Sequence, residues 1–163
     1  MKKLLFLLAL VVCGNVANAQ FKVGGNLGLP AGDISDYYKV SAGLDLYYMF
    51  GESKDAFLKF GATSGFLYYA DDVSGGDFKD ASFIPIAGAA RITFLSTLTF
   101  GPDIGYAIGL DELVINDGTD SGFYWRAVLG IDLGNTIELN AFYHSISAGT
   151  VFSSVGGGIL FIF

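Results

Sequence analysis

The chain has 163 residues and a formal net charge of −7, and 52% of its residues are hydrophobic. This length suits one domain, and the acidic balance excludes nucleic acid as a partner because its electrostatic footprint has the wrong sign. No apolar run approaches the length of a membrane-spanning helix. High hydrophobicity without such a run indicates alternation of apolar and polar residues, which is typical of membrane-spanning β-barrels.

The first 19 residues have the pattern of an export signal. Two lysines precede the apolar stretch Leu4–Val12, and Ala17–Ala19 has the small residues of a cleavage site. We therefore expect residues 1–19 to be a cleaved signal peptide and residues 20–163 to be the exported domain. The only cysteine, Cys13, leaves with the signal, so disulfides, thiol catalysis and cysteine metal sites are excluded from the mature chain. A lipoprotein signal would have a small residue before that cysteine, where this chain has valine.

Segments of alternating polarity fill the remaining chain. Successive side chains of a strand point to opposite faces, so alternation produces one apolar and one polar face. Thr97–Leu110 shows this most clearly, because its apolar residues alternate with threonine, glycine, aspartate and alanine. In chain order, the predicted strands are Phe21–Leu29, Tyr38–Phe50, Ala56–Ala70, Ser82–Phe94, Thr97–Leu110, Gly122–Leu133, Thr136–Ile146 and Val151–Phe163.

These strands predict an all-β fold, an eight-stranded antiparallel up-and-down transmembrane β-barrel. About ten tilted residues are enough to cross a bilayer. Bacterial barrels have short periplasmic turns and longer external loops, and the predicted connections alternate in that way. In chain order they include a break at Pro30–Asp33, the acidic loop Asp71–Asp80, a tight turn at Leu95–Ser96, the acidic loop Asp111–Ser121, a turn at Gly134–Asn135 and a short loop at Ser147–Gly149.

Charged residues recur on the face predicted to line the barrel. They are Lys22, Asp45, Lys59, Arg91, Asp103, Arg126, Asp132 and Glu138. Buried charges need partners, and an eight-stranded interior is about wide enough to be filled by side chains. We therefore expect a salt-bridge network that plugs the lumen. A narrow ion path lined by the same groups, or a ligand cavity widened by the inward glycines, is the alternative.

Aromatic residues near the predicted strand ends point toward lipid, where they would form two interfacial girdles. They are Tyr48, Phe50, Phe94, Phe100, Phe123, Trp125, Tyr143 and Phe163. Acidic residues gather in the longer loops: Asp33, Asp36, Asp71, Asp72, Asp77, Asp80, Asp111, Glu112, Asp117 and Asp120. Oxygen clusters can hold calcium, but the spacing does not match an EF-hand loop. These acids predict a solvated surface, or divalent cations that bridge to anionic lipid head groups and lipopolysaccharide.

His144 is the only histidine, and its surroundings loosely resemble the His-x-Ser site of outer-membrane lipid A deacylases. In that motif the two side chains lie on one face of a strand. Here Ile146 occupies the position two residues after His144, whereas Ser145 and Ser147 point the other way. No acidic residue follows Glu138 to orient the imidazole, and a histidine without such a partner activates a nucleophile poorly. We therefore expect no catalytic residues.

The strand sequences IPIAGAARITF, FGPDIGYAIGL and IELNAFYHSIS, with the terminal Phe163, resemble the Bacteroidetes-type outer membrane protein β-barrel domain. The resemblance extends over nearly all of residues 20–163. It implies a barrel in the outer membrane of a Gram-negative cell, with Phe163 recognised by the barrel assembly machinery. It supplies no catalytic residues.

The sequence predicts a monomeric, non-enzymatic outer-membrane protein without cofactor or metal, with a structural or surface-interaction role through its acidic loops. A narrow channel or small-ligand transporter is the alternative, and a lipid-modifying enzyme is a third. A soluble lipocalin-like barrel would place its apolar residues inside. The number of charges on the inward face argues against such a ligand cup.

Overall fold

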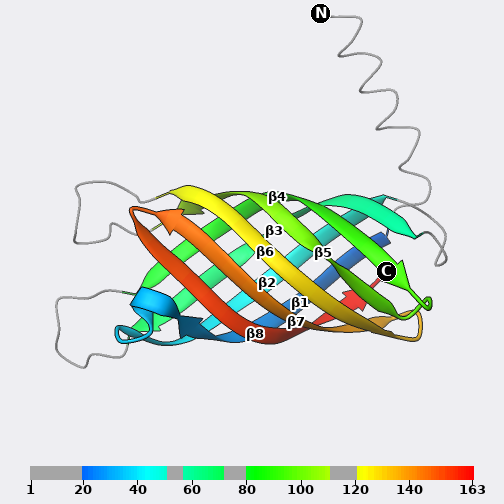
Figure 1. Cartoon of the computed structure of the whole chain (residues 1–163), viewed down its shortest axis with the longest axis horizontal. Helices are drawn as coiled ribbons and strands as arrows, with labels where there is room; N and C mark the ends of the chain where they lie inside the picture. Colours follow the sequence, from blue (N-terminus) through cyan, green and yellow to red (C-terminus); the bar gives the residue numbers. More distant parts are fainter. Residues whose placement is uncertain (1–19, 51–56, 72–79, 111–120) are drawn as a thin grey trace, which may run out of the picture.

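The computed structural model describes residues 20–50, 57–71, 80–110 and 121–163. These residues form a closed barrel in which each strand pairs antiparallel with its neighbours in sequence and β8 returns to β1 (Figure 1). The strands are β1 (Gln20–Ala31), β2 (Tyr38–Phe50), β3 (Leu58–Asp71), β4 (Ala81–Phe94), β5 (Leu98–Gly109), β6 (Gly122–Leu133), β7 (Ile137–Ala148) and β8 (Thr150–Ile162). The prediction of an eight-stranded up-and-down barrel is confirmed.

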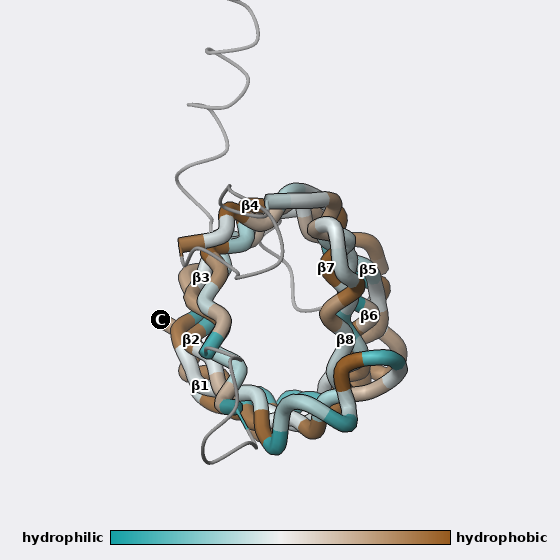
Figure 2. The backbone as a smooth tube through the Cα atoms, turned by 90° about the vertical axis from the view of Figure 1, so that its left-hand side faces the viewer, coloured by the Kyte–Doolittle hydropathy of each residue, from teal (hydrophilic) through white to brown (hydrophobic). Residues whose placement is uncertain are grey.

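The barrel closes where its first and last strands meet. Phe21 and Phe163 exchange backbone hydrogen bonds of 3.4 and 2.9 Å, and the β1–β8 register extends from Lys22 opposite Ile162 to Ala31 opposite Ser153. Viewed along the barrel axis, the strands form an unbroken ring (Figure 2). Closure satisfies the backbone donors and acceptors of both strands, which an open sheet would leave exposed.

The two ends of the barrel differ, and we name them by their connections. The loop end contains the short 3₁₀ helix η2 (Gly32–Ile34) and the turn at Gly149. The turn end contains the β4–β5 and β6–β7 turns (Figure 1). In the β4–β5 turn, Leu95 and Ser96 both have a φ of 53°, the backbone that a tight hairpin turn requires. No helix among the described residues is long and apolar enough to span a membrane.

Several strand ends differ from the sequence prediction by one or two residues, and two of these differences have a clear physical reason. The first strand was expected to break at Pro30, yet β1 continues through Ala31. Beyond Gly28 it pairs with β8 alone, and such an edge position tolerates proline. The loop expected over residues 147–149 shrinks to Gly149, because β7 extends to Ala148 and β8 begins at Thr150. Gly149 reverses the chain with a φ of 70°, which glycine adopts without steric cost.

The structure confirms which strand residues point inward and which point outward. Exposed and buried residues alternate along β5, and the outward leucines Leu27 and Leu44 are 65% and 61% exposed. The predicted girdle aromatics all lie on the outer face and are exposed or half-buried. The barrel surface is therefore an apolar band around a filled interior.

The interior also contains large apolar side chains, which the sequence analysis did not anticipate. Toward the loop end, a buried cluster includes Tyr38, Tyr69, Phe83 and Phe152 and is covered by Ile34 of η2. A smaller cluster lies toward the turn end, around Tyr47, Met49, Ala89 and Leu160. The charged residues lie between these clusters and toward the turn end, so the lumen is packed rather than uniformly polar.

Candidate functional site: the charged network of the lumen

The eight charged residues predicted to line the barrel all lie on its inner face. All are buried except Asp132, which is half-buried. In order around the barrel they are Lys22 on β1, Asp45 on β2, Lys59 on β3, Arg91 on β4, Asp103 on β5, Arg126 and Asp132 on β6, and Glu138 on β7. Alternation along each strand sets the face of these residues, and the closed register decides which of them meet.

An ion pair between Asp45 and Arg126 crosses the middle of the lumen. Arg126 Nη1 lies 2.8 Å from Asp45 Oδ1, and Asn26 Nδ2 donates to the other carboxylate oxygen at 2.8 Å. The Arg126 guanidinium also lies over the ring of Phe142, with Cζ 4.2 Å from the centroid, a favourable cation–π position. Arg126 is 1% exposed, so this guanidinium depends on its protein partners for compensation of its charge.

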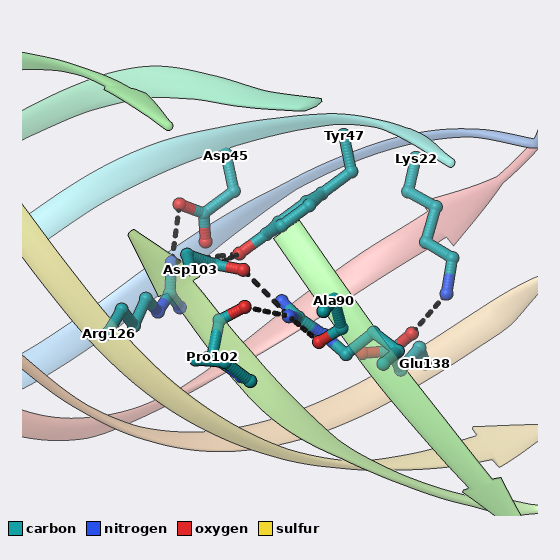
Figure 3. Close-up of polar contacts among 9 residues, drawn as sticks. Lys22, Asp45, Tyr47, Ala90, Pro102, Asp103, Arg126 and Glu138 are labelled. Atoms are coloured by element: carbon teal, nitrogen blue, oxygen red, sulfur yellow. Dashed lines mark hydrogen bonds and ion pairs between the residues drawn. The ribbon is translucent and has the colours of Figure 1, made fainter. Parts of the chain in front are cut away.

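Tyr47 joins this pair to a second one (Figure 3). Its hydroxyl donates to Asp103 Oδ2 at 2.8 Å and accepts from Arg126 Nη1 at 3.5 Å. The other oxygen of Asp103 lies 2.7 Å from Arg91 Nη1. The Arg91 guanidinium lies 5.3 Å from the Tyr47 ring centroid. Asp45, Arg126, Tyr47, Asp103 and Arg91 thus form one continuous network.

A further ion pair lies nearer the turn end. Lys22 donates to Glu138, joining β1 and β7 past the intervening β8 (Figure 3). Lys59 and Asp132 both line a pocket at this end of the barrel. The structure therefore brings the predicted charges together in the middle and turn-end parts of the lumen.

The loop-end part of the lumen is filled by aromatic rings. The ring of Tyr69 has centroid distances of 5.9, 6.2 and 5.4 Å to Tyr38, Phe83 and Phe152. Its hydroxyl lies 2.7 Å from Nε2 of His144, which is fully buried. Edge-to-face pairs at these distances stabilise packing beyond simple burial. The aromatic cluster therefore closes the lumen above the charged network.

His144 is placed for packing rather than for hydrolysis. Its ring stacks on Phe142 at a centroid distance of 5.3 Å and an interplanar angle of 4°. Ser145 follows on the opposite face of β7, where the Ser153 hydroxyl donates to its hydroxyl at 3.0 Å. A nucleophile and its base must lie within hydrogen-bond reach, and these two residues project from opposite faces.

Metal-binding geometry was considered for the acidic residues as well. Within residues 20–50, 57–71, 80–110 and 121–163, no group of His, Cys, Asp and Glu side chains is placed to hold a metal ion. The predicted loop acids Asp72, Asp77, Asp117 and Asp120, with Asp111 and Glu112, lie outside the described residues. At the edge of this region, Asp80 accepts hydrogen bonds from the Asp71 amide and the Tyr68 hydroxyl.

Sequence reasoning missed several residues that complete the site. Tyr47 and Asn26 have the inward parity of the charged set, and that parity was the signal that could have found them. The same holds for the aromatic residues Tyr69, Phe142 and Phe152, which also have the inward parity. Their specific partners could not be read from parity, because those partners lie on distant strands.

No family model and no curated protein matches the chain. Several solved structures are similar to it in fold. A crystal structure of Ail, the attachment invasion locus protein of Yersinia pestis, has a TM-score of 0.58 at 13% identity, with 89% of this chain and 97% of that chain covered. Neisserial surface protein A has a TM-score of 0.55 at 10% identity, with 89% and 96% covered. A de novo designed transmembrane β-barrel has a TM-score of 0.57 at 10% identity, with 90% and 96% covered.

These similarities extend along almost the whole barrel at low sequence identity. They establish the architecture, because unrelated sequences can share one fold while their functions lie in different sites. The predicted relation to the Bacteroidetes-type barrel domain is not supported by any matching family model. The chain has the fold of the small outer-membrane β-barrels.

Proposed function

We propose that this chain is an integral outer-membrane protein that acts at the cell surface through its loop end, without enzymatic activity. Its outer face is an apolar band of strand residues with aromatic side chains near the strand ends. Such a band with aromatic girdles is the lipid-facing surface of bacterial barrels. The fold shared with Ail and Neisserial surface protein A agrees with this location.

The observation that carries the proposal is the filled lumen. The Asp45–Arg126 pair crosses the barrel, and the aromatic cluster around Tyr69 packs above it. A solute would have to separate both to pass from one end to the other. An eight-stranded barrel filled in this way is a support for its loops rather than a conduit. This favours a surface role over the alternative of a narrow channel.

The chemistry of the surface follows from the loop sequences. Asp71–Asp80 and Asp111–Ser121 are rich in aspartate and glutamate, and the charge of the whole chain is −7. Acidic loops attract cationic partners and repel anionic ones. The partner class proposed for this surface is therefore cationic. It comprises positively charged polypeptides, or divalent cations shared with anionic lipid head groups.

Cysteine labelling on intact cells tests the location and orientation. Cys13 lies in the predicted signal, so Ser74→Cys and Asn135→Cys give single reporters in the loop and turn regions. A membrane-impermeant maleimide is expected to label Ser74→Cys on intact cells and Asn135→Cys only after lysis. Labelling of Asn135→Cys alone on intact cells would reverse the orientation. The absence of both from the outer-membrane fraction would refute the location.

Adhesion measures the proposed surface chemistry. Cells that express the chain are expected to bind a polylysine-coated surface more than cells that express a variant with Asp72, Asp77, Asp117 and Asp120 changed to Asn. Equal adhesion at equal surface expression contradicts the role of the acidic loops. Planar-bilayer recording addresses the channel alternative: steady currents that change in Arg91→Gln or Asp103→Asn would make the protein a channel.

A further inference from the structure

A shallow apolar groove of about 550 Å³ lies on the outer face of the barrel, across the adjacent strands β8, β1 and β2 (Figure 1). The lining residues are Gly25, Asn26, Leu27, Ala42, Gly43, Gly157, Gly158 and Ile159. Half of them are glycines, so strand backbone forms much of the floor. We call this feature the glycine groove.

The packing of the barrel does not require the two glycines that face outward in this groove, Gly25 and Gly157. A Cβ atom at Gly25 would lie 3.6 Å from its nearest neighbour, and one at Gly157 would lie 3.3 Å from the Asn140 carbonyl oxygen, only slightly closer than usual. The inward glycines of the same strands differ, because a Cβ atom at Gly24 or Gly156 would overlap a backbone carbonyl oxygen. Glycine weakens a strand interior and often marks a place where a ligand approaches the backbone closely. The two outward glycines therefore indicate contact with something outside the barrel.

The lining of the glycine groove is chemically apolar. Its backbone belongs to the β1–β2 and β1–β8 ladders, in which Leu27 is paired with Ala42 on one side and Gly157 on the other. Backbone groups that are already paired can face hydrocarbon without cost. The side chain of Asn26 points into the lumen, where it donates to Asp45. The groove therefore suits a hydrocarbon occupant rather than a polar one.

The depth of the glycine groove in the membrane follows from its place along the strands. Gly157 lies near the middle of β8, about six residues from either end. Six strand residues span about 20 Å, and the strand tilt of a barrel reduces this to about 15 Å along the axis. Half of the hydrocarbon core of a bilayer is also about 15 Å thick. The groove therefore lies near the middle of the bilayer and is continuous with the apolar band of the outer face.

We propose that the glycine groove holds one acyl chain of a membrane lipid, which lies against the backbone of β8, β1 and β2 and exchanges more slowly than the lipids on the rest of the band. A second copy of the protein fits less well, because apolar surfaces within lipid lack a hydrophobic driving force for association. A rigid barrel would also have to match the projecting Leu27, whereas a flexible acyl chain bends around it. This inference rests on the membrane location proposed above.

Photo-crosslinking maps the acyl chains around the barrel. The chain is expressed in full, purified from the outer membrane and placed in phosphatidylcholine vesicles that contain a phosphatidylcholine with a diazirine near the end of one acyl chain. Crosslinks on Leu27, Ala42 and Ile159, located by mass spectrometry, are expected to exceed those on Ile86 and Ile104 at least about fivefold. The latter two lie at mid-height on the β4–β5 wall and are more exposed than Ile159. Equal crosslinking of the two walls overturns the proposal, and absence of crosslinks from the whole outer face would refute the membrane location as well.

Filling the groove tests the assignment. Gly25→Leu, alone and combined with Gly157→Ala, adds side chains where a Cβ atom can be accommodated, and it is expected to lower crosslinking of Leu27 to the level of the β4–β5 wall. Gly88→Leu on that wall is the matched control, because a Cβ atom there would lie 3.9 Å from its nearest neighbour, and it should leave the groove crosslinks unchanged. Heat-modifiable migration on a gel verifies that each barrel is folded. Unchanged crosslinking of Leu27 in the folded combined variant overturns the assignment.

Leu27→Cys distinguishes a lipid from a second copy of the protein. Cys13 lies in the predicted signal, so the mature variant has a single cysteine. In vesicles with a large excess of lipid, oxidation is expected to leave the chain monomeric on a non-reducing gel. A disulfide-linked dimer would mean that a second barrel covers the groove, and it would overturn the proposal.

Discussion

Asp45 on β2 and Arg126 on β6 form an ion pair of 2.8 Å from opposite sides of the barrel. In either direction around the sheet, three strands separate β2 from β6: β3, β4 and β5 one way, and β1, β8 and β7 the other. The pair therefore ties together two walls that share no backbone hydrogen bonds. The pair can form only when the barrel is closed. A variant that removes it therefore tests the packing of the interior as a whole.

Removal of Arg126 should expose this dependence. Arg126→Met leaves the buried Asp45 carboxylate without its cation, and loss of one member of a buried pair costs about 3–5 kcal/mol. Urea unfolding of the protein in lipid vesicles measures the loss. Adding Asp45→Asn should recover part of it, because the amide needs no counter-ion and still accepts from Asn26. No recovery in the double variant would show that the destabilisation has another origin.

Phe152 tests the aromatic closure of the loop end. It is 2% exposed and lies 5.0 and 5.4 Å from the rings of Phe83 and Tyr69. Phe152→Ala is expected to destabilise the barrel by about 3 kcal/mol in the same urea assay, because it leaves a cavity in packed surroundings. Phe123→Ala is the comparison on the outer face, where the ring is 52% exposed. A smaller effect of Phe152→Ala than of Phe123→Ala would contradict the packed-lumen description.

Gly101 permits the close approach of β5 to β4. A Cβ atom at this position would overlap the backbone carbonyl oxygen of Ala90, which cannot move without disturbing the ladder. Gly101→Ala is therefore expected to lower the unfolding free energy by about 1–3 kcal/mol. At Gly88 a Cβ would lie 3.9 Å from the Ile104 carbonyl oxygen. Gly88→Ala should accordingly be neutral, and equal losses in both variants would refute the steric explanation.

The β4–β5 turn offers a stabilising change. Leu95 has a φ of 53° and is 89% exposed. Its Cβ atom strains the left-handed backbone, and its side chain makes few packing contacts that would offset this strain. Leu95→Gly is expected to raise the unfolding free energy by about 1 kcal/mol. The same urea titration measures the gain. A loss of stability would mean that the Leu95 side chain contributes contacts that exceed the backbone strain.

Asp80 should titrate below the ordinary range of an aspartate. The backbone amide of Asp71, and then the hydroxyl of Tyr68, stabilise its carboxylate and lower its pKa. Because the folded pKa is lowered, the contribution of these bonds to stability is present above the unfolded pKa of about 4. It is lost as the pH falls through the lowered folded pKa.

Carbon-13 NMR of the Asp80 carboxyl measures this pKa directly. Tyr68→Phe removes one donor and should move the pKa of Asp80 part of the way back toward its ordinary value. The Asp71 amide bond remains in that variant and should keep the pKa below the ordinary value. An unchanged pKa in Tyr68→Phe would exclude the hydroxyl as a cause.

The sequence by itself determined the barrel and the face of almost every strand residue. Side chains alternate with a period of two in any strand, so the sequence alone places Lys22, Asp45 and Arg126 on the inward face. Glycine and polar clusters marked most of the turns. The exceptions, Pro30 and the chain around Gly149, depended on how far β8 pairs with its neighbours, and pairing between strands is not a local property.

Only the tertiary structure decided which inward residues meet. Asp45 and Arg126 are separated by 81 positions along the chain, and Tyr47 lies 56 positions from Asp103. Parity gives each of them an inward direction, while strand tilt, register and closure set their height and angle around the axis. The same geometry separated the aromatic loop end from the charged turn end, because both kinds of residue share one parity and differ only in where closure places them.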